Sequence, residues 1–195
     1  MQRPRLVLAS GSPRRLELLA SVGVDPLVLA PEVDETPMPG EAAVDLAVRL
    51  AATKAAAVSV EPNDVVVGFD TIVIVDGDPL GKPSDLGHAR DMLHRLSGRT
   101  HQVVTAVCVK VGDWSAVEPA VAAVTFRTLN DDDVDWYLST GEPMGKAGSY
   151  AIQGAGALFV TEINGNYSGV VGLPLPLVDE LLGRIGRPLL SWVGT

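Results

Sequence analysis

Residues 65–75 constrain the fold more than any other stretch, because a carboxylate interrupts what is otherwise a run of core residues. Residues 65–67 and 72–75 are rich in β-branched side chains and predict two buried strand segments. Asp70 lies between them, and an ionised carboxylate is rarely buried without a partner because its desolvation is costly. Three roles therefore fit Asp70: a turn residue, a cap for neighbouring backbone groups, or a functional carboxylate.

Lys82 comes seven residues after the second of these runs, behind Gly81 and in front of Pro83. A lysine at this position can swing back toward the carboxylate of Asp70. An acid beside a cation suits phosphate chemistry, so the question for the rest of the sequence is whether it carries further groups that could bind phosphate.

Ser10, Ser12, Arg14 and Arg15 surround the start of the first expected helix, for which Ser12 is a suitable N-cap. A helix N-terminus favours anions by about 0.3–1 kcal/mol each, so two arginines there oppose the macrodipole. A bound anion would remove this conflict, because backbone N–H groups, two hydroxyls and two guanidinium groups would converge on it. The alternative is a pair of solvated arginines on a surface helix.

Lys54 and Glu35 are charged residues associated with the second expected helix. Residues 41–58 carry an apolar stripe at helical spacing, and Lys54 falls on the edge of that stripe. Its amine is placed to reach whatever the helix packs on, although a lysine there also commonly extends to water. Glu35 lies in a proline-containing loop before the helix, which on its own resembles an ordinary surface loop.

Lys146, Tyr150 and Gln153 lie in a glycine-rich stretch, residues 141–154. A lysine among glycines can bring its ammonium group close to a ligand. Tyr150 and Gln153 could supply a stacking face and an amide. By contrast, the Asn-Asp-Asp-Asp run at residues 130–133 is better explained as the acidic start of a helix than as a metal cluster, because helix N-termini favour such residues.

Composition restricts the class of protein. The 195 residues suit one domain or at most two small ones. Because 47% of them are hydrophobic and strands alternate with helices, a mixed-sheet α/β domain is expected. A net charge of −9 argues against a nucleic-acid-binding surface, although a local basic pocket remains compatible with it. The chain shows neither a secretory signal pattern nor a long apolar run, which predicts a cytoplasmic protein without a membrane partner.

Taken together, these motifs resemble the Maf family, nucleotide pyrophosphatases once described as septum-formation inhibitors. The resemblance covers nearly the whole chain, and its blocks follow the family order, which is specific where any one block would be weak. They are LASGSPRR at 8–15, DE at 34–35, KA at 54–55, DT at 70–71, GKP at 81–83, LSGRTH at 96–101, KAGSY at 146–150, IQG at 152–154 and VGLP at 171–174.

The resemblance implies an α/β fold with an elongated, curved mixed β-sheet and flanking helices, similar to the inosine triphosphate pyrophosphatases. It implies a single domain over residues 1–195, with two lobes around a cleft, and a homodimer as in many members of the family. The implied activity is hydrolysis of a nucleoside triphosphate to the monophosphate and diphosphate, with Mg²⁺ or Mn²⁺ as cofactor.

The resemblance also implies roles for single residues. The residues that would hold the triphosphate are Ser10, Arg14, Lys54 and Lys82. Glu35 and Asp70 would bind the metal and manage the water. The family pattern makes Asp70 the proton acceptor, whereas the residues alone leave open whether Asp70 or Glu35 is the base.

Arg15, Thr71 and Gln153 stand where the family sets its base preference. Gln153 resembles the branch that prefers thymidine and uridine nucleotides, and an amide complements uracil, although a flipped amide would suit cytosine. We therefore expect dTTP and UTP, with modified pyrimidine nucleotides as further candidates, over 7-methyl-GTP. Two residues depart from the family pattern: Phe69 replaces a frequent alanine, and Gly145 replaces an aspartate before Lys146.

Two other functions compete with this interpretation. The protein could be a nucleotide-binding regulator of cell division and septum formation that acts through a protein partner. It could also be a phosphatase that releases orthophosphate from the γ position. The products formed from UTP distinguish all three.

Overall fold

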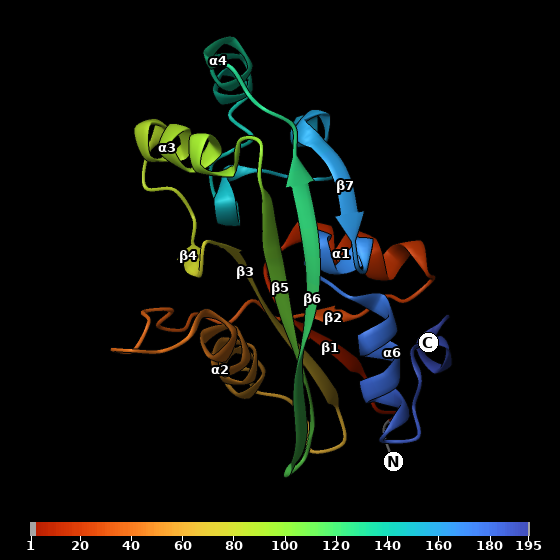
Figure 1. Cartoon of the computed structure of the whole chain (residues 1–195). Helices are drawn as coiled ribbons and strands as arrows, with labels where there is room; N and C mark the ends of the chain where they lie inside the picture. The colour runs from red at the N-terminus through yellow and green to blue at the C-terminus, as the bar shows by residue number, and fades with distance from the viewer. Residues whose placement is uncertain (1–2, 195) are drawn as a thin grey trace. The chain divides into compact units, whose positions relative to one another are not determined.

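The computed structural model describes residues 3–194 and shows a mixed α/β fold (Figure 1). Its strands are β1 Leu6–Ala9, β2 Leu27–Val28, β3 Val65–Val75, β4 Asp78–Leu80, β5 Thr100–Val111, β6 Trp114–Phe126 and β7 Val160–Asn164. Its α-helices are α1 Pro13–Ser21, α2 Ala43–Ala56, α3 Leu86–Leu96, α4 Asp131–Ser139, α5 Tyr167–Val171 and α6 Leu175–Gly183. Three short 3₁₀ helices cover Ala147–Ser149, Ala155–Phe159 and Leu189–Trp192.

The strands form one seven-stranded mixed sheet in the order β2-β1-β3-β5-β6-β7, with β4 paired to β3. Strand β1 runs parallel to both β2 and β3, and its pairing with β3 extends from Leu6 opposite Val65 to Ala9 opposite Gly68. Strands β4 and β7 are antiparallel to β3 and β6 respectively. The expected α/β fold with a mixed sheet and flanking helices is therefore confirmed.

Strand β3 is continuous through Asp70. Every residue from Val65 to Val75 belongs to the strand, and all except Thr71 are buried. The expectation of two strand segments is wrong, and so are the turn and cap roles considered for Asp70. A strand can continue through an aspartate when another residue compensates its charge, so the partner of Asp70 becomes the central question.

The chain divides into two compact units, which are described separately. The first comprises the residues up to Asp70, Thr105–Ala120 and the residues from Gly172 onward. The second comprises Thr71–Val104 and Val121–Val171. The predicted arrangement of two lobes around a cleft stays a prediction. Within residues 3–194, no helix combines the length and the apolar character needed to cross a membrane.

In the first unit, helices cover both faces of β3 (Figure 1). At Gly68, a Cβ atom would lie 2.4 Å from the Ala51 carbonyl oxygen and 2.8 Å from the Ala55 backbone nitrogen, so α2 approaches the bare backbone of the strand. Phe69 points to the opposite face, since side chains alternate along a strand. There it shares an apolar pocket with Leu19 of α1 and Val178 of α6.

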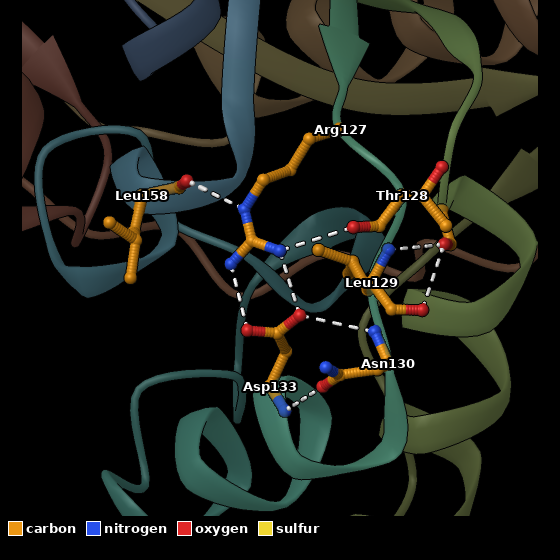
Figure 2. Close-up of polar contacts among 7 residues, drawn as sticks. Arg127, Thr128, Leu129, Asn130, Asp133 and Leu158 are labelled. Atoms are coloured by element: carbon orange, nitrogen blue, oxygen red, sulfur yellow. Dashed lines mark hydrogen bonds and ion pairs between the residues drawn. The ribbon is translucent and has the colours of Figure 1, made fainter.

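In the second unit, Arg127 connects the end of β6 to the start of α4 (Figure 2). Its guanidinium group forms two hydrogen bonds with the Asp133 carboxylate, at 2.7 and 2.8 Å, and also donates to the carbonyl oxygens of Leu158 and Thr128. Asn130 and Asp133 form a reciprocal capping box at the helix N-terminus. Asn130 is thus the N-cap and residues 131–133 the acidic first turn of a helix, as predicted.

Replacing Gly68 by Ala tests the close approach of α2. We expect Gly68→Ala to lower the free energy of unfolding by about 1–3 kcal/mol, because the added methyl group meets backbone atoms that must shift. Urea denaturation measures this change. Gly183→Ala is the matched control, since no atom of the described residues outside its chain neighbours and its own helix backbone lies within 4 Å of its Cβ position, and it should change stability by less than about 0.5 kcal/mol. Equal stability of both variants would contradict the tight contact.

The Arg127 network predicts a dependence of stability on pH. Hydrogen bonds from Arg127, and then from the Asn130 backbone, lower the pKa of Asp133 from 3.8 to about 2. A carboxyl group whose pKa is lowered by folding stabilises the fold above its unfolded pKa and loses that contribution as the pH falls through the folded value. The stability difference between wild type and Asp133→Asn should therefore shrink between pH 4 and pH 2.

Urea midpoints at pH 7, 4 and 2 measure this difference. Asp132→Asn is the control, because among the described residues the exposed Asp132 side chain has no hydrogen-bonding partner, and its difference from wild type should stay small throughout. A difference for Asp133→Asn that is the same at all three pH values would contradict the assignment.

Candidate functional site

Lys54 is the partner of Asp70. Its Nζ atom lies 2.6 Å from Oδ1 of Asp70 and 2.6 Å from Oε1 of Glu35, so one ammonium group contacts two carboxylates. The Lys54 and Asp70 side chains are only 12% and 10% exposed, whereas that of Glu35 is 44% exposed. The prediction that the amine of Lys54 reaches what its helix packs on is confirmed, and the alternative of extension to water is wrong.

The close contact at Gly68 explains how Lys54 reaches Asp70. Gly68 and Asp70 are two residues apart in β3, so they occupy the same face of the strand. Because Gly68 lacks a side chain, the backbone of α2 can lie directly on that face. Lys54 immediately precedes Ala55, which contacts Gly68, and its side chain extends along the strand to the carboxylate of Asp70.

The predicted divalent metal fits the chemistry of these donors. Among residues 3–194, no three His, Cys, Asp or Glu side chains come together as a metal-binding group. Mg²⁺, however, is commonly held by one or two carboxylates together with water and substrate phosphates. Glu35 and Asp70 supply two carboxylates gathered around one cation, Lys54, which suits a metal bound together with a polyphosphate.

Ser10 and Ser12 lie between β1 and α1. Ser10 is only 6% exposed, and its Oγ atom accepts hydrogen bonds from Nη1 of Arg15 at 2.8 Å and from the Ser12 backbone nitrogen at 3.3 Å. Ser12 occupies the predicted N-cap position, with Pro13 as the first helical residue, but its side chain makes no capping hydrogen bond. The start of α1 is therefore organised around the oxygen of Ser10.

Arg15 is held from three sides. Besides its contact with Ser10, its Nε atom donates to the Gly172 carbonyl oxygen at 2.7 Å, and its guanidinium carbon lies 5.3 Å from the centre of the Phe69 ring. Burial lowers its pKa to about 10, while the charge of Asp70 opposes the change and the charge of Arg14 adds to it. Arg15 is nevertheless protonated at neutral pH.

Arg14 is half-buried beside Arg15 in the first turn of α1. The repulsion between the two guanidinium groups contributes to the lowered pKa of Arg15, so they are close enough to interact. No acidic residue lies in the first turn of this helix. Positive side chains and the positive end of the helix dipole thus coincide, which is favourable for an anion and unfavourable without one.

The second unit carries Thr71, Lys82, Lys146 and Gln153. The backbone nitrogen of Gly148 donates to the Gly81 carbonyl oxygen at 3.1 Å, so the loops that carry Lys82 and Lys146 are joined. Lys82 is exposed, and Lys146 is half-buried with its Nζ atom 3.3 Å from the Met144 carbonyl oxygen. Two lysines expected to approach the same ligand therefore lie on adjacent loops.

Tyr150 does not offer a stacking face to a ligand. It is 6% exposed, its hydroxyl group lies 2.9 Å from Nε2 of His101, and its ring packs edge-on against Phe126. Burial raises the pKa of its hydroxyl group and lowers that of His101 to about 4. Its position in a glycine-rich stretch suggested access to a ligand, but its aromatic partners come from distant strands.

Glu142 is a residue that the sequence analysis did not identify. Its carboxylate accepts hydrogen bonds from the Tyr137 hydroxyl group at 2.7 Å and from the backbone nitrogens of Ala155 and Gly156 at 2.9 and 3.0 Å. These bonds anchor the segment that carries the exposed Gln153. No local pattern marks Glu142, because its partners lie up to 14 residues away.

Comparison with known proteins agrees with the motifs. A profile for the family described as Maf-like protein matches residues 5–185. This chain belongs to the Maf-like family. Three Maf-like relatives, each named dTTP/UTP pyrophosphatase, come from Symbiobacterium thermophilum, Anaeromyxobacter dehalogenans strain 2CP-1 and Methylococcus capsulatus.

These relatives are 48%, 49% and 50% identical to this Maf-like chain. The alignments cover 96%, 95% and 93% of this chain and 97%, 96% and 91% of the respective relatives. A solved structure, that of the Staphylococcus aureus Ham1 protein, aligns with a TM-score of 0.45 at 16% identity, over 96% of this chain and 93% of that one. A structural similarity at that level is too low to support a conclusion about the present Maf-like chain.

Replacing Lys54 tests whether it compensates the charge of Asp70. Lys54→Met should lower the free energy of unfolding by about 1–3 kcal/mol, because the largely buried carboxylate of Asp70 loses its cation. Adding Asp70→Asn should recover part of this loss, since it removes the uncompensated charge. Urea denaturation of the single and double variants measures the coupling. Lys110→Met is the control, because the Lys110 ammonium group donates a hydrogen bond to the Gly112 carbonyl oxygen and not to a carboxylate. Additive effects at Lys54 and Asp70 would contradict the pairing.

Proposed function

We propose that this protein is a nucleoside triphosphate pyrophosphatase that converts dTTP and UTP, and modified pyrimidine nucleotides, to the monophosphate and diphosphate. Such an activity would remove unwanted nucleotides from the cellular pool. The names of the relatives support the substrate class. The observation that carries the proposal is the contact of Lys54 with both Asp70 and Glu35, because it gathers two carboxylates and a cation at one place.

The triphosphate would bind to cations and hydroxyl groups at the start of α1 and to further cations carried by loops. Ser10, Ser12 and Arg14 surround a helix N-terminus without acidic residues, which favours phosphate oxygens. Lys54 would neutralise a phosphate oxygen once it releases a carboxylate. The family pattern adds Lys82, and the joined glycine-rich loops support a similar role for Lys146.

Hydrolysis breaks the phosphoanhydride bond between the α and β phosphates, with water attacking in line with the departing diphosphate. Asp70 would orient this water and accept its proton, and Glu35 would hold the metal or act as a second carboxylate. A Mg²⁺ or Mn²⁺ ion bound to Glu35 and Asp70 would neutralise phosphate oxygens and stabilise the departing diphosphate. Before substrate binds, the contact of Lys54 with both carboxylates gathers them for this purpose.

The preference for uracil and thymine would come from Gln153. Its side-chain oxygen can accept from the N3–H group of the base, and its NH₂ group can donate to a carbonyl oxygen. The family pattern also places Thr71 and Arg15 near the base. Glu142 supports this role of Gln153 in base recognition. Its carboxylate accepts hydrogen bonds from the backbone nitrogens of Ala155 and Gly156, and so holds the segment that directly follows Gln153.

The proposal includes the cellular location of the enzyme and its binding partners. We place it in the cytoplasm, where its nucleotide substrates occur, with neither nucleic acid nor membrane as a partner. A homodimer follows from the family pattern. The acidic net charge of −9 supports a small anionic ligand bound at a local basic site over binding along a nucleic acid.

Product analysis tests the activity. Incubation with UTP and Mg²⁺ should yield UMP and diphosphate, whereas UDP with orthophosphate would indicate a phosphatase. No product would favour a nucleotide-binding regulator that acts through a protein partner. Asp70→Asn should lower kcat by at least about 100-fold while UTP binding persists, because a general base typically contributes that much.

Asp45→Asn is the matched control, since this exposed carboxylate of α2 is outside the proposed site and should leave turnover unchanged. Turnover of Asp70→Asn within a few-fold of wild type would show that Asp70 is not the base. A substrate panel in the same assay tests the base preference. Faster turnover of 7-methyl-GTP than of UTP would exclude the pyrimidine assignment.

A further inference from the structure

The hydroxyl group of Ser10 has a defined hydrogen-bonding polarity. A serine hydroxyl can accept about two hydrogen bonds and donate one. The Oγ atom of Ser10 already accepts from Nη1 of Arg15 at 2.8 Å and from the backbone nitrogen of Ser12 at 3.3 Å. Its remaining capacity is donation, and its burial limits the groups that can receive the proton. Ser10 is therefore prepared for a ligand that accepts hydrogen bonds, such as a phosphate oxygen.

Arg15 is the stronger of the two donors that set this polarity. It is charged, so its hydrogen bond to Ser10 is stronger than one from a neutral group. Its Nε atom is committed to the Gly172 carbonyl oxygen at 2.7 Å, which fixes the plane of the guanidinium group. The position of Nη1 against Ser10 thus follows from a contact with a residue 157 positions away.

Phe69 supports the guanidinium group from one side. The ring is fully buried, and its centre lies 5.3 Å from the guanidinium carbon of Arg15, within the range of a cation–π contact. Phe69 replaces an alanine that is frequent in the family. An alanine at this position could not make the contact with Arg15.

We propose that Arg15 is a positioning residue that orients the Ser10 hydroxyl group toward the triphosphate, and that Phe69 holds Arg15 in place for this task. The inference rests on the proposed function, in which Ser10 binds the triphosphate. In this proposal, Arg15 is not one of the residues that recognise the base of the nucleotide. Both of its hydrogen bonds described above go to Ser10 and Gly172 of the protein itself.

Two roles for Arg15 predict different kinetics. If Arg15 acts through Ser10, its replacement affects all nucleoside triphosphates equally, and the effect disappears once the Ser10 hydroxyl group is absent. If Arg15 contacts the base, its replacement changes the ratio of activities on UTP and CTP and stays effective without that hydroxyl group. A merely structural role would lower thermal stability without either kinetic signature.

A double-mutant cycle separates these roles. Arg15→Lys retains the charge but loses the planar fork, and it should lower kcat/KM for UTP, dTTP and CTP alike by roughly tenfold. In the Ser10→Ala background, the same change should cost less than about twofold. Phe69→Leu, which keeps an apolar side chain of similar size, should lower kcat/KM by about two- to fivefold and also lose its effect in that background.

Arg184→Lys is the matched control, because Arg184 pairs with Glu118 and Glu180 outside the proposed site and should leave kcat/KM unchanged. Thermal unfolding of every variant checks that the fold is retained. Additive losses from Arg15→Lys and Ser10→Ala, or a changed ratio of UTP to CTP activity, would overturn the proposal.

Failure of the proposed function would be recognised separately, because the wild type would then release no diphosphate from any nucleotide. In that event the same cycle, measured as the dissociation constant for UTP by calorimetry, still tests the coupling. A loss of UTP affinity in Arg15→Lys that vanishes in Ser10→Ala would support the positioning role. Independent effects on affinity would contradict it.

Discussion

The contact between Lys54 and Asp70 is the interaction on which the rest of the first unit depends. A carboxylate in the middle of a buried strand would destabilise the core unless a cation compensated its lost hydration. Lys54 supplies that cation from α2, and it reaches Asp70 because Gly68 lets the helix lie on the strand backbone. The same ammonium group draws in Glu35 from a loop. One buried charge thus explains the position of a helix, a glycine and a second carboxylate.

Positive charge is concentrated locally in a chain whose net charge is −9. Arg14 and Arg15 lie at the start of α1, and in the second unit Lys82 and Lys146 lie on two loops joined by a backbone hydrogen bond. Such concentrations are unfavourable by themselves, since like charges repel, and become favourable when an anion binds. Each of these two concentrations is therefore suited to a small anionic group rather than to an extended polyanion.

Buried and half-buried polar anchors hold the segments that carry these ligand-binding candidates. Glu142 binds two backbone nitrogens beyond Gln153, while the hydroxyl group of Tyr150 pairs with His101 before it. Ser10 is held in a comparable way by Arg15. Anchors of this kind reduce the freedom that the loops would otherwise lose on binding, which favours a preorganised site. Polar side chains of this kind therefore hold in place the glycine-rich segment that carries Gln153.

The sequence by itself determined the α/β class, the strand-forming runs around Asp70, the acidic start of α4 and the side of α2 on which Lys54 lies. These features depend on neighbouring residues, because side-chain periodicity and helix capping act over a few positions. Only the tertiary structure decided that β3 continues through Asp70, that Tyr150 is buried, and that Arg15 contacts Ser10. Those outcomes depend on residues far away in the chain: Lys54 lies 16 positions from Asp70, His101 lies 49 from Tyr150, and Gly172, which holds the Arg15 side chain, lies 157 from it. No local pattern specifies which distant residue will compensate a charge or cover a ring.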